Sequence, residues 1–236
     1  MSQTELIGVF RELYRTRAFS EFRATLHCHS YHSDGVMFPT ELVDTAARQG
    51  FTTVAITDHD TTAAYLERVS VPGSDGSATV IEYGRRKGVQ VIPGIELTCW
   101  WRWHPVHILA YGLDPGDEHT LRLCTMTRMA GYKRITLKWW PVQAMSVCQL
   151  VLALGGIPVL AHPGFYWVNV RRMIGELVEF GGLVGVETEY EYRTHHLRLQ
   201  CPIWTPKNIR ELADRYGLLR TGGADSHGRD LRKYRG

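Results

Sequence analysis

The sequence predicts an α/β fold built on a parallel sheet. Short β-rich runs alternate with helix-like patterns along most of the chain. Strand followed by helix is the rhythm of parallel strands joined by right-handed crossovers, and seven strands close most simply as a barrel. A chain of 236 residues is long enough for one such domain. The predicted strands are Ala24–His29, Thr52–Thr57, Val89–Leu97, Val106–Tyr111, Ile157–Ala161, Leu183–Glu187 and Leu218–Gly222.

Proline and glycine mark the ends of helices predicted between these strands. Pro39 and Pro206 suit the first turn of a helix, where a missing backbone N–H costs little. Gly50 and Gly217 suit the left-handed residue that follows a helix. The predicted helices are Pro39–Gln49, Val170–Phe180 and Pro206–Tyr216.

Composition limits the class of protein. We expect one domain over residues 1–236, with 1–22 as an N-terminal helical extension. The first 20 residues mix acidic and basic side chains and lack the apolar core of a signal peptide. No apolar run approaches the length of a membrane-spanning helix. The net charge of +3 is too small to indicate nucleic-acid binding by itself, but it is compatible with an anionic substrate.

The cysteines indicate a reducing compartment. They are odd in number, widely spaced and free of any CxxC pair. Reduced thiols in a cytoplasmic protein are therefore expected. Cys28 lies between two histidines but faces the other side of its strand, so we expect it to pack in the core. The five are Cys28, Cys99, Cys124, Cys148 and Cys201.

The most informative segment is residues 25–35, TLHCHSYHSDG, followed downstream by ITDHD at 56–60. Side chains two apart on a strand point the same way, so His27 and His29 project together from the end of the first strand. Two imidazoles aimed at one point, with the carboxylate of Asp34 five residues on, suit a divalent metal ion.

These segments resemble the first motifs of the PHP (polymerase and histidinol phosphatase) family of metal-dependent phosphoesterases. The likeness continues in order through PGIE at 93–96, VHIL at 106–109, AHPG at 161–164 and GADSHG at 223–228. It implies a distorted (β/α)7 barrel, in which the chemistry lies at the C-terminal ends of the strands. The polar residues that fall at predicted strand ends are His27, His29, Asp58, His59, Glu96, His162, Glu187 and Asp225.

The resemblance also implies a set of nine ligands for two or three divalent ions. Carboxylates neutralise such ions and imidazoles fix their geometry, and these ligands accept Mn, Fe or Zn. His27, His29, Glu96 and Asp225 would hold one ion. Asp34, His59 and His227 would hold a second, and Glu96, His107 and His162 a third.

Ions roughly 3.5–4 Å apart can share a hydroxide and clamp the attacking and leaving oxygens of a phosphoester. We expect Glu96, Asp34 and Asp225 to hold the metals that carry this hydroxide, for in-line displacement at phosphorus. The sequence lacks a GxSxG elbow and a GxxxxGK[ST] loop, which argues against a serine hydrolase or a nucleotide-hydrolysing switch.

Three further carboxylates have two interpretations each. Asp58 and Asp60 flank His59, and either could orient a metal ligand or cap a helix. Glu187 ends a predicted strand and could reach the site, or could be a buried, hydrogen-bonded carboxylate.

Substrate contacts are predicted outside the ligand set. By the resemblance, His195 or His196 would bind a phosphate oxygen, although an exposed pair is nearly as plausible. Arg134 could guide an anion, although a solvated helix face is the usual meaning of its spacing from Lys138. Trp101 could stack on a nucleobase, but sealing of the barrel rim is favoured. Histidines outside the motifs are expected to have no ligand role: His32, His104 and His119.

One departure from the family pattern concerns the substrate. Several nucleotide-cleaving relatives carry a long helical insertion, with a Gly-Arg-Pro-His stretch, between the positions of His107 and His162. Only 54 residues intervene here, and that stretch is missing. The ligand set is complete but the segment that would cap a small nucleotide is reduced.

The sequence thus predicts a cytoplasmic metal-dependent phosphoesterase that hydrolyses a small phosphomonoester, such as a nucleotide or a pathway metabolite. The alternative enzyme is a nuclease that trims the 5′ ends of short oligonucleotides. A third hypothesis is a non-catalytic, metal-stabilised module, which the complete ligand set argues against. Oligomeric state is not predicted.

Overall fold

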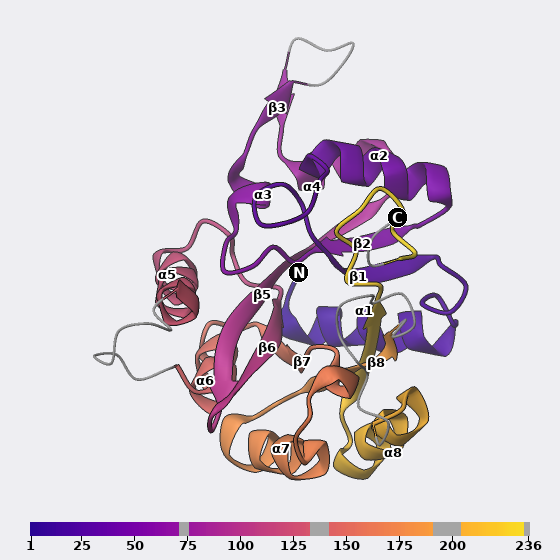
Figure 1. The fold of residues 1–236 in the computed structure, drawn as a ribbon. Coiled ribbons are helices and arrows are strands. Elements are labelled where there is room, and N and C mark those ends of the chain that lie inside the picture. The colour runs from indigo at the N-terminus through magenta and orange to yellow at the C-terminus, as the bar shows by residue number, and fades with distance from the viewer. Residues whose placement is uncertain (71–75, 133–141, 191–203, 234–236) are drawn as a thin grey trace.

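A seven-stranded, barrel-shaped sheet organises the chain (Figure 1). The structure is a computed structural model that describes the chain outside residues 71–75, 133–141, 191–203 and 234–236, with backbone only at 129–132. The strand order is β1-β2-β5-β6-β7-β8-β9. The bounds are β1 Ala24–Cys28, β2 Thr53–Ile56, β5 Gln90–Trp101, β6 His104–Tyr111, β7 Ile157–Leu160, β8 Gly185–Tyr190 and β9 Leu219–Gly223.

Helices cover the outside of this sheet. Pro39–Gln49 and Pro206–Tyr216 are helical as predicted, whereas the third predicted helix changes to a π-helical turn, Leu177–Gly181, after Glu176. A small hairpin, β3 Val69–Ser70 with β4 Ser77–Ala78, projects from the body (Figure 1). The helices are α1 Gln3–Arg15, α2 Pro39–Gln49, α3 Ala63–Leu66, α4 Val80–Arg86, α5 Glu118–Tyr132, α6 Ala144–Ala153, α7 Val170–Glu176 and α8 Pro206–Tyr216, with a 3₁₀ turn at Pro163–Phe165. No helix among the described residues is long and apolar enough to cross a membrane.

The prediction of a wholly parallel sheet is wrong for one strand. β6 runs antiparallel to both β5 and β7, because a tight turn at Arg102–Trp103 joins β5 directly to β6 in place of a helical crossover. The pairs β1/β2, β2/β5, β7/β8 and β8/β9 are parallel as expected. Reversal puts the start of β6 beside the end of β5, so His107 lies opposite Thr98 at the same edge as Glu96.

The opposite end of the barrel is closed by α1. Its buried residues Leu6 and Phe10 form one core cluster with side chains from β1, β2, β5, β6 and β7. Phe10 meets Tyr111 edge to face, with ring centroids 5.1 Å apart. The barrel is therefore packed with side chains at this end and leaves its polar groups at the other.

The outer face of the sheet holds the remaining core. Leu42 and Ala46 of α2 pack over β1 and β2, and Cys28 joins them with its thiol 3.0 Å from the carbonyl of Ala55. This confirms that Cys28 is a packing residue. The other described cysteines, Cys99, Cys124 and Cys148, are also buried and unpaired with one another, and Cys201 lies outside the described residues.

The seam between β9 and β1 nearly closes the barrel. The amide of His29 donates to the carbonyl of Ser226 at 2.8 Å, and that of Ser226 donates to the carbonyl of His27 at 3.3 Å. Gly223 makes this approach feasible, because a Cβ at that position would lie 2.6 Å from the backbone nitrogen of His27.

We expect Gly223→Ala to lower the free energy of unfolding by about 1–3 kcal/mol, the usual cost of overpacking a rigid site. Urea denaturation of wild type and variant measures this difference. Gly8→Ala is the matched control, because a Cβ at Gly8 meets nothing within 4 Å and alanine favours the α1 helix. Equal stability of Gly223→Ala and wild type would contradict the tight seam.

Candidate metal centre

The C-terminal ends of β1 and β9 and the middle of β5 bring four of the predicted ligands together. Nε2 of His27 lies 3.3 Å from Oε2 of Glu96 and 3.2 Å from Oδ1 of Asp225. Nε2 of His29 lies 3.2 Å and 3.0 Å from the same two oxygens. All four side chains are buried, and their ligand atoms lie within 4.8 Å of one another. They are the four residues expected to share the first ion.

Glu96 stands at the centre because its two oxygens face different groups. Oε2 faces His27, His29 and His59. Oε1 lies 2.7 Å from Nδ1 of His107 and 3.0 Å from Nε2 of His162. A carboxylate with ligand atoms on both sides has the geometry of a bridge between two ions.

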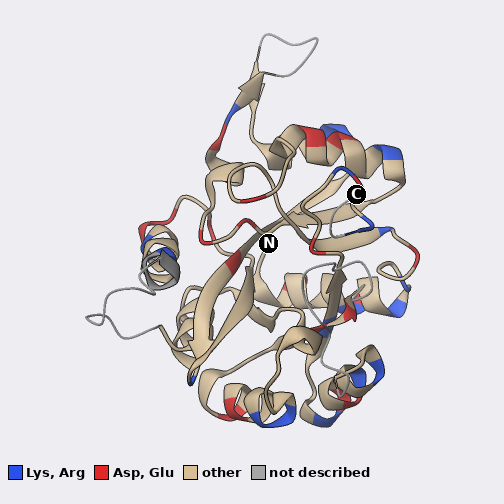
Figure 2. Ribbon diagram, in the orientation of Figure 1, with Lys and Arg blue, Asp and Glu red and all other residues tan. Residues whose placement is uncertain are grey.

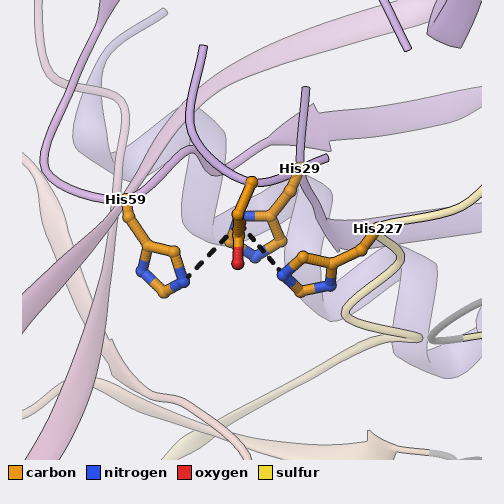
Figure 3. Close-up of side chains that lie close together, drawn as sticks. His29, His59 and His227 are labelled. Carbon is orange, nitrogen blue, oxygen red and sulfur yellow. Dashed lines mark ion pairs between the residues drawn. The ribbon is translucent and has the colours of Figure 1, made fainter. Parts of the chain in front are cut away.

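Asp34 gathers the remaining ligands at the open side of the site. Its Oδ1 lies 3.1 Å from Nε2 of His227 and 3.9 Å from Nε2 of His59. Figure 3 shows His29, His59 and His227 directed toward a common point between them. Half of the Asp34 side chain is exposed, at 52%, so this part of the site is reachable from solvent.

The structure groups the ligands slightly differently from the expectation. His59 lies near Asp34 through Nε2 and near Glu96 through Nδ1, so it contacts both the second and the third expected group. His29 also approaches Asp34, with Nδ1 3.5 Å from Oδ1. Its Nδ1 lies 3.3 Å from the Ser33 hydroxyl, which leaves Nε2 as the nitrogen aimed at the first group.

Unusual backbone conformations accompany these positions. His162 and Asp225 have φ angles of 27° and 49°, in the left-handed region that non-glycine residues rarely adopt. Such conformations cost about 1–3 kcal/mol and cluster at functional sites, where the surrounding structure enforces them. Each residue lies two positions after the end of a strand, β7 or β9, where the chain turns.

Buried partners fix the orientation of several ligands. Glu187 lies 3.2 Å from Nδ1 of His27 and accepts from the amide of His162 at 2.8 Å. Nδ1 of His227 lies 2.8 Å from the carbonyl oxygen of Asp225. A carbonyl only accepts, so Nδ1 of His227 carries the proton and Nε2 is available as a ligand.

Asp58 holds the loop that carries Asp34. It accepts hydrogen bonds from the amide and hydroxyl of Ser30, at 2.7 and 2.6 Å, and from the hydroxyl of Ser33 at 2.7 Å. Asp58 is thus linked to His29 through the Ser33 hydroxyl. Asp60 caps no helix here but accepts from the amide of Thr98 at 2.8 Å.

Electrostatics favour the cation-binding protonation state at Glu96, His59 and His162, but the protonated ring at His29. Burial opposes the charge on Glu96, but the surrounding imidazoles led by His107 hold its pKa well below the usual value. Burial lowers the pKa of His59 to about 3 and that of His162 to about 4. Burial would also lower the pKa of His29, but Asp225 and Glu96 outweigh it and raise that pKa to about 10. A cation would therefore compete with a proton at His29 but not at His59 or His162.

The donor set fits divalent ions better than it fits a hydrogen-bonded core. Nε2 of His27 and of His29 are fully buried, yet neither makes a hydrogen bond of acceptable geometry with any part of the chain that the structure describes. The carboxylate oxygens 3.0–3.3 Å away lie in the wrong direction for one. Orphaned buried nitrogens are costly, whereas nitrogens and oxygens converging on one point suit a metal ion.

The sequence matches the PHP domain over residues 25–161, more than half of the chain. The chain belongs to the PHP domain family. The likeness to a phosphoribosyl 1,2-cyclic phosphate 1,2-diphosphodiesterase of Eggerthella lenta is 28% identity over 86% of this chain and 94% of that protein. A 3′,5′-nucleoside bisphosphate phosphatase of Chromobacterium violaceum is 35% identical over 39% of this chain, which spans only 28% of that enzyme.

Solved structures show the same fold. A Bifidobacterium adolescentis protein, provisionally described as a metal-dependent phosphoesterase, superposes with a TM-score of 0.69 at 23% identity and 88% coverage of both chains. A Chromobacterium violaceum amidohydrolase with bound sulfate gives a TM-score of 0.66 at 22% identity, with 89% of each chain covered. The predicted PHP family, barrel-like fold and class of enzyme are confirmed: this PHP protein is a metal-dependent phosphoric ester hydrolase.

Of the predicted substrate residues, only Trp101 is described. It is 5% exposed, and its indole N–H donates to Glu176 at 2.9 Å, beside the ion pair of Glu176 with Arg102. This contact favours the interpretation that Trp101 seals the rim of the barrel. A contact of Trp101 with the substrate stays a prediction. His195, His196 and Arg134 lie outside the described residues. His32 pairs with Glu67 at 2.8 Å on the surface side of its loop, and His104 is exposed, in keeping with no ligand role.

Two tyrosines of this PHP protein were missed by the sequence analysis. Tyr190 donates to Oδ2 of Asp225 at 3.0 Å. The hydroxyl of Tyr166 accepts from the amide of His107 at 2.9 Å. Both rings lie against His162, with centroids 5.6–5.8 Å away. No motif marks them, because each is placed by a turn or irregular strand whose geometry local sequence does not specify.

Proposed function

We propose that this PHP protein hydrolyses a phosphoester of a small phosphorylated molecule with two or three divalent ions, Mn, Fe or Zn. The observation that carries the proposal is the convergence of five imidazoles on the two oxygens of Glu96. We propose the following ligand roles, which the contacts among these side chains support: His27, His29, Glu96 and Asp225 hold one ion, Asp34, His59 and His227 a second, and Glu96, His107 and His162 a third.

Side chains of this protein would hold the ions and orient the groups that bind them. Ions bound in such a site supply a hydroxide nucleophile at neutral pH and neutralise charge on the phosphoryl oxygens. Glu96 and Asp225 are buried carboxylates that would offset the charge of the cations, and the neighbouring imidazoles hold the pKa of Glu96 well below its usual value. Glu187 and the carbonyl of Asp225 hold the rings of His27 and His227 in the tautomers that ligate. Asp34, on the solvent side, lies where a phosphate group can enter.

The relatives narrow the substrate class. The Eggerthella lenta relative, which this chain spans almost completely, acts on a cyclic phosphate of a phosphorylated ribose. The Chromobacterium violaceum relative acts on nucleoside 3′,5′-bisphosphates. Both substrates are small and carry more than one phosphate position on a ribose. We infer a phosphorylated ribose derivative, hydrolysed as a phosphomonoester or as a cyclic diester.

A substrate panel tests the proposal. Metal-replete protein is assayed for phosphate release from nucleoside 3′,5′-bisphosphates and ribose phosphates, and by NMR for opening of phosphoribosyl 1,2-cyclic phosphate. Hydrolysis that stops on chelation and returns with Mn²⁺, Fe²⁺ or Zn²⁺ is the expected result. Failure of metal-replete protein to cleave any phosphoester in the panel would refute the proposal.

Asp34→Ala separates catalysis from a structural role of the metals. We expect kcat/KM to fall about 10²–10³-fold, as when a single charge-stabilising group is lost from an active site. The melting temperature measured in excess chelator should change little because Asp34 is half exposed. Glu179→Ala, on an exposed turn of the π-helical segment, is the control for removal of a carboxylate. Unfolding of Asp34→Ala, with no activity in the wild type, would instead support the non-catalytic module.

A nuclease is the second candidate, because a 5′-3′ exoribonuclease of Escherichia coli is 36% identical over 59% of this chain, which spans 43% of that enzyme. Figure 2 shows Lys and Arg mixed with Asp and Glu over α1, α2, α7 and α8, which favours a small substrate over a long polyanion. A nuclease would contact several phosphates, so its rate would fall steeply with salt and depend on oligonucleotide length. A rate indifferent to both excludes it.

A further inference from the structure

The tyrosine at the end of β8 contacts the metal centre through one ligand. The Tyr190 hydroxyl donates to Oδ2 of Asp225 at 3.0 Å. The other oxygen of that carboxylate, Oδ1, is the one that lies 3.0–3.2 Å from Nε2 of His27 and His29. The two oxygens of Asp225 are thus divided between a fixed donor and the first ligand group.

An irregular strand puts Tyr190 on this side of the sheet. In a regular strand, side chains alternate, so Glu187 and Tyr190, three residues apart, would face opposite sides. The pairing of β8 with β9 shifts register between Glu187 and Glu189, where β8 has one residue more than β9. This bulge restores Tyr190 to the side of Glu187, which itself contacts His27.

The residues around the bulge fit this arrangement. Glu189 points outward and pairs with Arg210 at 3.1 Å, as expected if the bulge reverses the alternation. Gly222 lies opposite, and a Cβ there would come within 2.7 Å of the carbonyl oxygen and the Cβ of Glu189. A glycine at that position leaves the extra residue room. The register shift in β8, the glycine opposite it in β9 and the ion pair of Glu189 with Arg210 are therefore all consistent with a bulge in β8.

Packing holds the Tyr190 ring in place. The side chain is 6% exposed, and its ring meets Phe165 edge to face with centroids 5.5 Å apart. The ring also lies 5.8 Å from the ring of His162, centroid to centroid. A donor held by two aromatic contacts loses little conformational freedom when it hydrogen-bonds, so it can set the direction of Asp225.

We propose that Tyr190 is a positioning residue of the metal centre: through the bulge in β8 it holds Oδ2 of Asp225, so that Oδ1 is directed at the ion shared with His27 and His29. This inference rests on the proposed metal ligands. It predicts that loss of the single hydroxyl group of Tyr190 weakens the binding of one ion. Partners that orient metal ligands typically contribute about 10–100-fold to metal affinity.

The test is Mn²⁺ binding to chelator-treated protein, followed by calorimetry and by electron paramagnetic resonance of free Mn²⁺. Tyr190→Phe should weaken the affected ion about tenfold or more and leave the other sites unchanged. Tyr83→Phe is the matched control, because the Tyr83 hydroxyl makes a comparable bond to Asp44, at 3.0 Å, between α4 and α2. Tyr83→Phe should bind Mn²⁺ as the wild type does.

A double-mutant cycle shows whether the effect passes through Asp225. When Asp225 is already Asn, Tyr190→Phe should cause no further loss of Mn²⁺ affinity. Additive losses, or wild-type affinity in Tyr190→Phe, overturn the inference while leaving the proposed function intact. If the wild type binds none of Mn²⁺, Fe²⁺ and Zn²⁺ in the same assay, the proposed function itself is overturned.

A crystal structure of the Mn²⁺-loaded wild type tests the same point without any variant. Oδ1 of Asp225 on the ion and Oδ2 on the Tyr190 hydroxyl is the expected arrangement. Both oxygens of Asp225 on the ion, or the Tyr190 oxygen as a ligand, would overturn the inference even if Tyr190→Phe fails to fold.

Discussion

Glu96→Gln is expected to abolish phosphoester hydrolysis, with kcat/KM reduced by about a thousandfold or more, since loss of several kcal/mol of metal-derived stabilisation corresponds to several factors of ten. The substitution keeps the size of the side chain and removes only its charge and one acceptor. Five histidine rings face the Glu96 oxygens, so the amide would turn an N–H toward ring nitrogens that need an anion between the ions. Metal content by elemental analysis and steady-state kinetics measure the result together.

The control for Glu96→Gln is Glu189→Gln. Glu189 lies two residues after Glu187 on β8 and pairs outward with Arg210, so its charge is near the centre but outside it. We expect Glu189→Gln to retain activity within a few-fold, because a partly exposed ion pair contributes at most about 1 kcal/mol. A Glu96→Gln protein with wild-type metal content and activity would contradict the bridging role of Glu96.

Most of the fold could be predicted because its elements are marked locally. Proline at the start and glycine after the end defined α2 and α8 residue for residue. The direction of β6 could not be predicted in this way. The alternation of side chains along a strand does not indicate the direction in which the strand runs. The choice between a hairpin and a crossover depends on the tight turn at Arg102, which has a φ of 56° although it is not a glycine.

The gathering of the proposed ligands at one place could be predicted because each of them lies in a short sequence motif. What the sequence did not reveal is how residues between motifs act on the ligands. Tyr190 is the clearest case: alternation along β8 places it on the wrong side, and only the bulge, formed against Gly222 of another strand, corrects that. The sequence also did not reveal that His59 approaches Asp34 through Nε2 and Glu96 through Nδ1, because the distance between those two carboxylates is defined only in the folded chain.

The second large effect is on stability: removal of metal should lower the melting temperature by about 8–16 °C. A ligand present at a thousand times its Kd stabilises the native state by about 4 kcal/mol, and 1 kcal/mol corresponds to roughly 2–4 °C for a domain of this size. Differential scanning calorimetry with excess Mn²⁺, and then with excess chelator, measures the shift.

The shift should be large because the centre is built of groups that are unfavourable when buried alone. The carboxylates of Glu96 and Asp225 belong to residues that are only 1% and 5% exposed. Nε2 of His27 and Nε2 of His29 make no hydrogen bond among the described residues. Cations between them replace repulsion and lost hydration by coordination. In Glu96→Gln the Mn²⁺-dependent shift should nearly vanish, which separates specific binding from a general salt effect. Equal melting temperatures of wild type in Mn²⁺ and in chelator would mean that these side chains satisfy one another without an ion.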